Sequence, residues 1–503
     1  MVFMSDILTY LETWLASFDE VPFNAVDSAL LAQFCMARGE GVMPRLLHPR
    51  EAGEEAAGAP RGRRGLRALV RDWRERRRDR RSYDVARRRC EGPQAVGEDV
   101  PRDSGRSTAS CPDSVDAGAA TLSASAVSAP TPFTATERDR GEELRDAGRP
   151  GPANGLAATL TAPAAVLDKE EAARDAAAPT NPVRFADLLR AELFPTMFSG
   201  MHQAQMRQQL FLMAASPRFR DLLIYDHRAA FDEALDLQFA ATTYVCPGRF
   251  AYVGFRGTDT TLTGWREDFN MAYLVPVPAQ DLAARYLAAV AADPRLPDTL
   301  ILGGHSKGGN LAEYAALTAA PEVQRRIAHL YSHDGPGFMA GAFCAADYAP
   351  LAGRMTKQVP EDSMVGILME SEMPEEVVKA TGRGFEQHSV FRWEVEEGAF
   401  ATVPELPERT QRRALALRRW LATMDGAERE RMVDALFDAV RAAGITDASQ
   451  IFEGGREWAI LRDGVMKAPM ADRTTMLNAL RGLTRAFSDA TAELNGARRA
   501  SKK

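Results

Sequence analysis

The sequence has 503 residues, of which 45% are hydrophobic and 26% are charged. This ordinary globular composition excludes a fibrous or wholly disordered chain. At roughly 150 residues per domain, the length suggests about three units. The formal net charge of −7 argues against a protein that binds nucleic acid over its whole surface.

The five cysteines include no C-x-x-C pair and form no even-numbered framework. We therefore expect neither a disulfide scaffold nor a zinc site, and the sequence predicts a reducing compartment, the cytoplasm. The first twenty residues lack the basic segment of a signal peptide. No run of 18 or more consecutive apolar residues occurs, so no transmembrane helix is expected.

Apolar residues recur at helical spacing from Ile7 to Phe18, which predicts an amphipathic helix with Ser5 as its N-cap. A second short helix is expected from Asp27 to Ala37. We assign residues 1–40 to an N-terminal helical segment that packs on the main domain.

Residues 41–182 differ in composition from the rest of the chain. Arg61 to Arg89 contains 14 arginines in 29 residues, and Ala-, Ser- and Pro-rich runs follow. Such residues bury too little apolar surface to offset the chain entropy, so a long disordered insertion is predicted. The arginine block is either a solvated linker or a contact for an anionic surface. Trp73 and Tyr83 alone make a poor base-stacking surface, so no specific nucleic-acid partner is expected.

Residues 183–404 show alternating strand-like and helix-like segments after a helical stretch, VRFADLLRAELF. This alternation predicts an α/β fold, and together with the motif described next an α/β-hydrolase domain with a mostly parallel sheet. Residues 405–503 form a C-terminal helical region, expected as a small bundle or a cap, and the oligomeric state is left open. The expected strands are 249–255, 298–304, 326–334, 354–360, 376–380 and 391–395, and the expected helices include 279–292 and 309–320.

The motif that carries chemistry is Gly304-His305-Ser306-Lys307-Gly308, a G-x-S-x-G. An apolar strand leads into it and an amphipathic helix leads out. This context predicts a nucleophile elbow, a strained turn that exposes the hydroxyl of Ser306 at the edge of the sheet. The alternative is a glycine-rich turn that merely packs.

A serine hydroxyl needs a base and an acid to activate it. His388 follows the serine in the chain order that α/β hydrolases use, and it lies in a loop between two strand-like segments. Asp334 and Asp362 each end a predicted strand at the edge where the serine emerges, and we prefer Asp334 as the acid. Glu386 is a further alternative.

An oxyanion hole needs two preorganised donors. One is expected to be the backbone N–H of Lys307, the residue after the nucleophile. The second is expected from Thr258, in the loop that Gly257 lets bend toward the serine, through its N–H and its hydroxyl. An ordinary β-turn is the alternative.

These motifs resemble those of the class 3 (fungal-type) lipases, which combine F-R-G-Ser/Thr, W-x-x-D and G-H-S-x-G-G. The counterparts here are Phe255 to Thr258, Trp265 to Asp268 and Gly304 to Gly309. A closer resemblance is to a bacterial family of lipase-like α/β hydrolases, the Mbeg-like family, with its opening helix, H-S-K-G-G-N, D-G-P-G-F and late Q-H. It covers roughly residues 5–40 and 185–400. The lipase pattern implies Asp362 as the acid, and the Mbeg-like pattern implies Asp334.

Lys307 replaces the apolar residue that is common after a lipase serine, and we expect it either to favour anionic or polar substrates or to reach solvent. The sequence thus predicts a serine ester hydrolase acting on a small-molecule acyl ester through an acyl-enzyme, with no cofactor and no metal. The alternative is a catalytically silent hydrolase-fold scaffold, with the block 61–89 contacting an anionic partner.

Overall fold

The structure, a computed structural model, describes residues 5–47, 178–452, 464, 466–467 and 469–501. The predicted insertion therefore lies mostly outside the described residues, and so does the arginine block. Within the described residues, one sheet has the order β1-β2-β3-β4-β5-β6-β7-β8-β11, and a hairpin pairs β9 with β10. The strands are β1 Val183–Arg184, β2 Leu223–Asp232, β3 Leu237–Cys246, β4 Phe250–Phe255, β5 Leu300–His305, β6 Ile327–His333, β7 Met355–Pro360, β8 Glu375–Val378, β9 Val395–Glu396, β10 Ala399–Phe400 and β11 Thr402–Val403.

The sheet is half parallel, not mostly parallel as the sequence suggested. β4 to β8 run parallel in sequence order. β1, β2, β3 and β4 pair antiparallel, and β11 closes the other edge antiparallel to β8. The long β2–β3 hairpin escaped prediction because β2 carries polar residues inward: Asp226 and His227 are both buried there.

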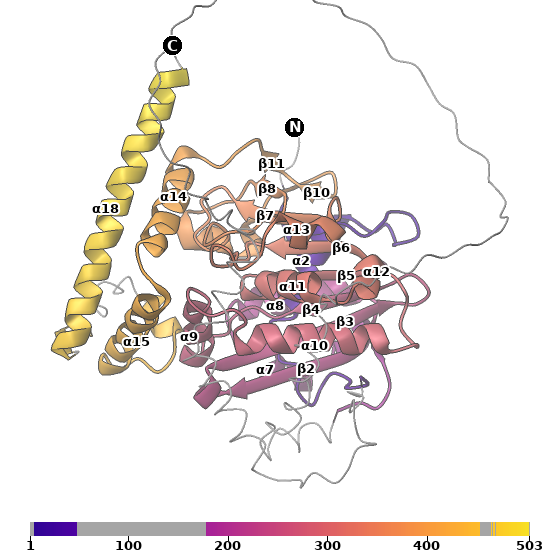
Figure 1. Ribbon diagram of the computed structural model, residues 1–503. Coiled ribbons are helices and arrows are strands. Elements are labelled where there is room, and N and C mark those ends of the chain that lie inside the picture. Colours follow the sequence, from indigo (N-terminus) through magenta and orange to yellow (C-terminus); the bar gives the residue numbers. More distant parts are fainter. Residues whose placement is uncertain (1–4, 48–177, 453–463, 465, 468, 502–503) are drawn as a thin grey trace, which may run out of the picture. The chain divides into compact units, whose positions relative to one another are not determined.

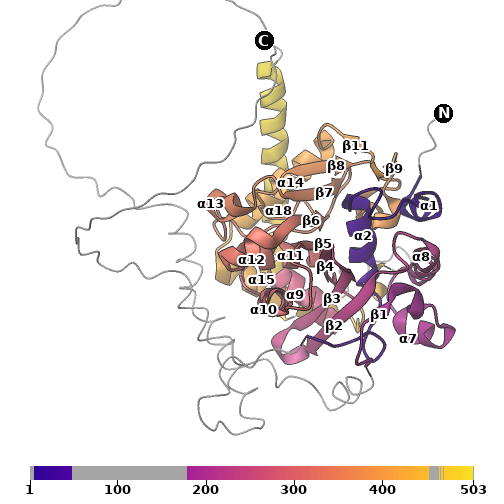
Figure 2. The ribbon, with the colours of Figure 1, turned by 90° about the vertical axis from the view of Figure 1, so that its right-hand side faces the viewer.

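Helices cover both faces of this sheet (Figures 1 and 2). α2 packs on β4, β5 and β6 from one side, beside α1 and α8, while α10 and α11 pack on the other side. The principal helices are α1 Ile7–Thr13, α2 Ala25–Phe34, α7 Phe194–Met197, α8 Gln203–Ala215, α9 Leu262–Asn270, α10 Pro278–Ala292, α11 Lys307–Thr318, α12 Pro321–Arg326, α13 Ala345–Tyr348, α14 Glu408–Ala422, α15 Gly426–Ala442, α16 Ser449–Phe452 and α18 Met470–Ser501.

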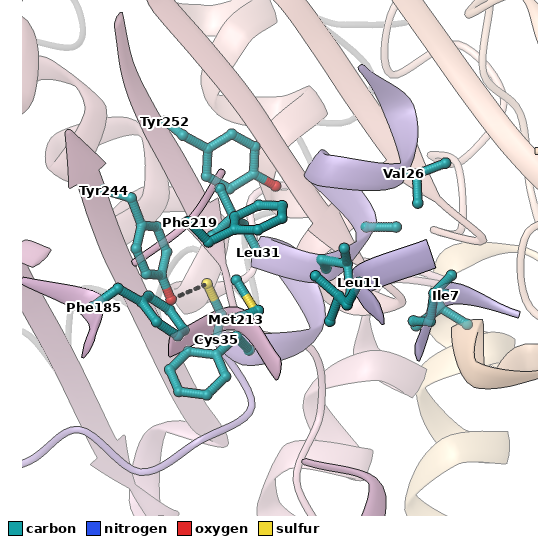
Figure 3. Close-up of a cluster of buried hydrophobic side chains, with 14 of the residues drawn as sticks. Ile7, Leu11, Val26, Leu31, Cys35, Phe185, Met213, Phe219, Tyr244 and Tyr252 are labelled. Carbon is teal, nitrogen blue, oxygen red and sulfur yellow. Dashed lines mark hydrogen bonds between the residues drawn. The ribbon is translucent and has the colours of Figure 1, made fainter. Parts of the chain in front are cut away.

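Each central strand supplies both hydrophobic cores because successive side chains point to opposite faces. In β5, Ile301 enters the core under α1, α2 and α8, whereas Leu300 and Leu302 enter the core under α10 and α11. Figure 3 shows part of the first core, where the Cys35 thiol lies 3.8 Å from the hydroxyl oxygen of Tyr244. Both faces of the sheet are therefore covered by apolar side chains.

The N-terminal segment is part of this fold and continues past the predicted boundary at residue 40 to Leu47. The main-chain N–H of Leu47 donates to the carboxylate of Asp226 at 2.8 Å. Arg218 fixes the segment from inside, because its buried guanidinium pairs with the buried carboxylate of Asp27 at 2.6 Å. The N-cap of α1 is Asp6, not Ser5, because the Asp6 carboxylate accepts from the N–H of Thr9.

Two predicted elements are wrong. The stretch VRFADLLRAELF is not one helix: β1 pairs with the edge of β2, and short 3-10 turns follow. Its apolar residues Phe185 and Leu188 are buried without a regular helix. The predicted strand 391–395 is a 3-10 helix over Val390–Arg392, and only Val395–Glu396 is a strand.

The C-terminal region is helical as predicted. α18 packs along α14 and α15 (Figure 1). These helices also contact the main domain. Arg413 of α14 donates to the carbonyl of Ser363 at 2.8 Å, and Asp434 of α15 pairs with Arg266 of α9. None of the helices described is long and apolar enough to cross a membrane.

Candidate active site

Ser306 lies in a strained turn between β5 and α11. Its φ of 59° is in the left-handed region that side chains other than glycine rarely adopt. The strain is held by hydrogen bonds on both sides: its N–H donates to the carbonyl of His333 at 2.9 Å, and its carbonyl accepts from Gly309 at 2.9 Å. Such strain persists only where the surroundings enforce it, and it often marks functional sites. Ser306 thus lies in a strained turn from a strand to a helix, which is the backbone feature expected of the predicted elbow.

The glycines of the motif are required by close backbone contacts. A Cβ on Gly308 would lie 2.1 Å from the carbonyl oxygen of Phe255, and one on Gly304 would lie 2.1 Å from the backbone of Gly308. Real Cβ atoms essentially never come that close. The two positions allow β5, α11 and the end of β4 to meet behind Ser306.

Asp334 emerges beside Ser306 at the same edge of the sheet. β5 and β6 are parallel neighbours with His305 opposite His333, so the residues that follow, Ser306 and Asp334, leave the sheet at one level. Asp334 also has a positive φ, 49°. The adjacent strands β5 and β6 are thus each followed by a residue with a positive φ and a reactive side chain, Ser306 and Asp334.

The Asp334 carboxylate is fully buried and contacts His388 directly. Nδ1 of His388 lies 2.6 Å from Oδ2 of Asp334. Because a carboxylate only accepts, the Nδ1–H donates and Nε2 is left as the basic nitrogen. The second oxygen, Oδ1, accepts from the hydroxyl of Ser363 at 2.6 Å and from the N–H of Gly366 at 2.9 Å. Three donors therefore satisfy the buried charge.

His388 ends a 3-10 helix, Gly384–His388, rather than lying in an open loop. Its carbonyl accepts from Nε2 of His305 at 2.6 Å, and the two imidazole rings are 4.6 Å apart between centroids. His388 is therefore packed against the residue that precedes Ser306. Burial lowers the pKa of His305 well below its ordinary value, so His305 is neutral.

Asp362 does not contact His388 through its carboxylate. Oδ2 accepts from the N–H of Gly384 at 2.9 Å, and Oδ1 pairs with Arg413 at 3.1 Å. Burial alone would raise the pKa of Asp362, but the Gly384 N–H and the Arg413 guanidinium outweigh it, and the pKa is lowered. Asp362 thus connects α14 to the turn that carries His388. Glu386 faces away: it caps that turn by accepting from the N–H of Arg383.

Gln387 and Asn310 have roles that the sequence did not reveal. The Gln387 side chain accepts from the N–H of Asp362 at 2.7 Å and donates to the carbonyl of Ala380 at 2.9 Å, which fixes the His388 turn. Asn310 donates to the carbonyl of Gly337 at 2.9 Å and so connects H-S-K-G-G-N to D-G-P-G-F. The available signal was that Asn310 belongs to the H-S-K-G-G-N motif and Gln387 to the late Q-H.

The loop after β4 lies against the elbow. A Cβ on Gly257 would be 3.3 Å from Cβ of Ser306 and 2.8 Å from the carbonyl oxygen of His305. The hydroxyl of Thr258 donates to Asp268 at 2.5 Å. Its hydrogen is therefore committed, which leaves the Thr258 N–H as the donor this residue can offer.

The expectation that the side chain of Lys307 reaches solvent is wrong. It is 1% exposed and turns away from solvent into the interior, where it pairs with Glu267 at 3.1 Å. It is therefore not the uncompensated cation that the expected preference for anionic substrates assumed.

Aromatic side chains lie next to His388. The ring of Phe385 is 5.2 Å from the His388 ring and 6.3 Å from the ring of Trp265, centroid to centroid. Phe385 is 41% exposed. An apolar surface thus borders the Asp334–His388 pair.

Comparison with known proteins identifies one family that is similar to part of the chain. No curated protein matches the chain. Residues 213–438 match the family model described as Mbeg1-like, a range that contains Ser306, Asp334 and His388. The relation to the class 3 lipases remains a prediction. The similarity to the Mbeg1-like family thus covers residues 213–438, slightly less than half of the 503 residues.

Proposed function

We propose that the protein is a serine hydrolase with an α/β-hydrolase fold that cleaves carboxylic esters. The observation that carries the proposal is the buried hydrogen bond of 2.6 Å between Asp334 and His388, packed against the strained turn of Ser306. In a Ser-His-Asp triad, a buried carboxylate orients an imidazole that lies next to the nucleophilic serine, and Asp334, His388 and Ser306 would fill these three roles.

In the proposed reaction, the hydroxyl oxygen of Ser306 attacks the ester carbonyl while Nε2 of His388 takes the hydroxyl proton. Asp334 holds the tautomer and stabilises the imidazolium. The tetrahedral intermediate collapses as His388 protonates the departing alcohol, which leaves an acyl-Ser306. Water then attacks the acyl group with His388 as base, and the acid and the free Ser306 are released.

The negative oxygen of each tetrahedral intermediate would be bound by two backbone donors, the N–H of Lys307 and the N–H of Thr258. Lys307 is the first residue of α11, so the N-terminal dipole of this helix acts in the same direction. No cofactor or metal enters this reaction.

We propose an acyl ester with an apolar portion as the substrate, because the exposed ring of Phe385 lies beside His388 and the partly buried ring of Trp265 lies beside Phe385. Such rings bind alkyl or aryl groups by excluding water. We also propose a location in the cytoplasm, as the cysteine pattern of the sequence predicts.

The test is hydrolysis of p-nitrophenyl esters of two to eight carbons by the full chain. Ser306→Ala and His388→Ala should abolish turnover, and Asp334→Asn should lower kcat by about 10³- to 10⁴-fold because the wrong tautomer is held. Asp362→Asn should lose much less. His329→Ala is the matched control, since His329 lies on the same sheet and contacts Thr356 at 2.9 Å.

An inactive, folded wild-type chain would contradict the proposal and favour the scaffold alternative. If Asp362→Asn lost as much activity as Asp334→Asn, the assignment of the acid would be wrong.

A further inference from the structure

The side chain of Lys307 is buried beside the proposed oxyanion hole and fully hydrogen-bonded. Its Nζ donates to the carbonyl of Gln238 at 2.8 Å, to the side-chain oxygen of Gln238 at 2.6 Å and to Glu267 at 3.1 Å. An ammonium group has three donors, and all three are used. Burying a charge is costly unless it is paired and hydrogen-bonded, so a defined role for this cation is expected.

Glu267, the partner of Lys307, is equally constrained. It is fully buried, and its carboxylate also accepts from the N–H of Gln238 at 3.0 Å and of Ala279 at 2.9 Å. Glu267 therefore fixes α9 against β3 and the start of α10. Its position in turn fixes the next residue of α9, Asp268.

Asp268 joins this pair to the oxyanion loop. One carboxylate oxygen accepts from the hydroxyl of Thr258 at 2.5 Å, and the other lies 4.0 Å from Nζ of Lys307. Burial raises the pKa of Asp268 to about 6, although Lys307 opposes the rise. The charged groups that face Asp268 are Lys307, Glu267 and Asp259. Lys307 is the cation among them, and it favours the ionised form that the Thr258 hydroxyl binds.

We propose that the Lys307 side chain is a positioning residue that acts through Glu267 and Asp268 to hold Thr258 in place for oxyanion binding. This inference rests on the proposed function, and it assigns Lys307 two roles in the oxyanion hole. Its backbone N–H is one oxyanion donor, while its side chain determines where the other donor stands. Preorganised donors lose much of their effect when displaced, since a shift of about 1 Å costs about 10²-fold.

The test is a double-mutant cycle in the full chain. Lys307→Met keeps an unbranched side chain that lacks only the terminal ammonium group, and Thr258→Val keeps the shape and the N–H while it removes the bond to Asp268. Each single variant should lower kcat for the p-nitrophenyl ester by about 10- to 100-fold, less than the loss of a whole donor, with KM changed less than about three-fold. Because both act on the same contact, the double variant should be no slower than the slower single variant.

Lys357→Met is the matched control. Lys357, on β7, is also a buried lysine, 3% exposed, and its Nζ lies 3.8 Å from Glu375. It should lose comparable thermal stability but keep kcat within about three-fold, and its small effect should add to that of Thr258→Val.

If Lys307→Met does not fold, Glu267→Gln interrupts the same path, and the same non-additivity with Thr258→Val is expected. The proposal would be overturned if the fold-losses in kcat of Lys307→Met or Glu267→Gln multiplied with that of Thr258→Val in the double variant. It would also be overturned if Lys307→Met or Glu267→Gln lowered the stability and left kcat unchanged. Failure of the proposed function is distinguishable, because then the wild-type chain itself would not exceed Ser306→Ala.

Discussion

His305 donates a hydrogen bond of 2.6 Å to the carbonyl of His388, so the residue before the proposed nucleophile holds the proposed base. β5 carries His305, and the 3-10 helix after β8 carries His388. His388 is therefore fixed by two contacts, one with Asp334 and one with the residue that precedes Ser306.

The His305 contact predicts a loss of activity without a change in pH dependence. His305→Phe keeps a ring and removes the donor, which costs about 1 kcal/mol, or about five-fold in kcat. Because burial lowers the pKa of His305 and keeps it neutral, the limbs of the pH–rate profile should not move. Steady-state kinetics from pH 5 to 9 measure both. His329→Phe should leave kcat unchanged, and an equal loss there would contradict the explanation.

Asp362 predicts a pH-dependent contribution to stability. Its pKa is lowered in the folded state, so its contribution is present above its unfolded pKa of about 3.9 and is lost as pH falls through the folded value. Asp362→Asn should therefore lower the Tm most near neutral pH, and the difference from wild type should shrink below about pH 4. Thermal unfolding at a series of pH values measures this. A difference that grows on acidification would show that the contacts with Gly384 and Arg413 are not what stabilises this loop.

Gly257 predicts a variant that folds but is slow. A Cβ there would lie 2.8 Å from the carbonyl of His305 and 3.3 Å from Cβ of Ser306, so the oxyanion loop must shift away from the elbow. For Gly257→Ala we expect kcat to fall by about 10²-fold, as for a lost oxyanion donor, while KM changes little. Gly200→Ala, at a position with open space around it and no positive φ, is the control for backbone substitution. Full activity of Gly257→Ala would place the oxyanion hole elsewhere.

Phe385 predicts chain-length selectivity. Removing this ring, which is 41% exposed beside His388, should raise KM for octanoate esters by about 10-fold and leave acetate esters nearly unchanged. The comparison of the two ester series for Phe385→Ala measures this. Exposed Phe231 on β2 is the matched substitution, and equal effects of both would remove the assigned role of Phe385.

The sequence predicted the central strands well because they are continuous apolar runs that end in motif residues, as β5 does at Ser306. It preferred Asp334 to Asp362 as the partner of His388 but left both open, because the D-G-P-G-F motif implied Asp334 and the lipase pattern implied Asp362; the structure places Asp334 at 2.6 Å from His388. It did not predict β2, because buried polar groups such as Asp226 look like surface residues until their partners are known. The same limit applies to Lys307, whose partner Glu267 is 40 residues earlier in the chain.

The most direct test of the account is labelling of the full chain with a fluorophosphonate, with the adduct located by mass spectrometry. The account predicts one adduct on Ser306, formed at least 10²-fold more slowly in Asp334→Asn and not at all in His388→Ala, because the nucleophile is activated through this pair. His329→Ala should label at the wild-type rate. A folded wild-type chain that carries no adduct at Ser306, or that labels equally fast without His388, would contradict the central claim.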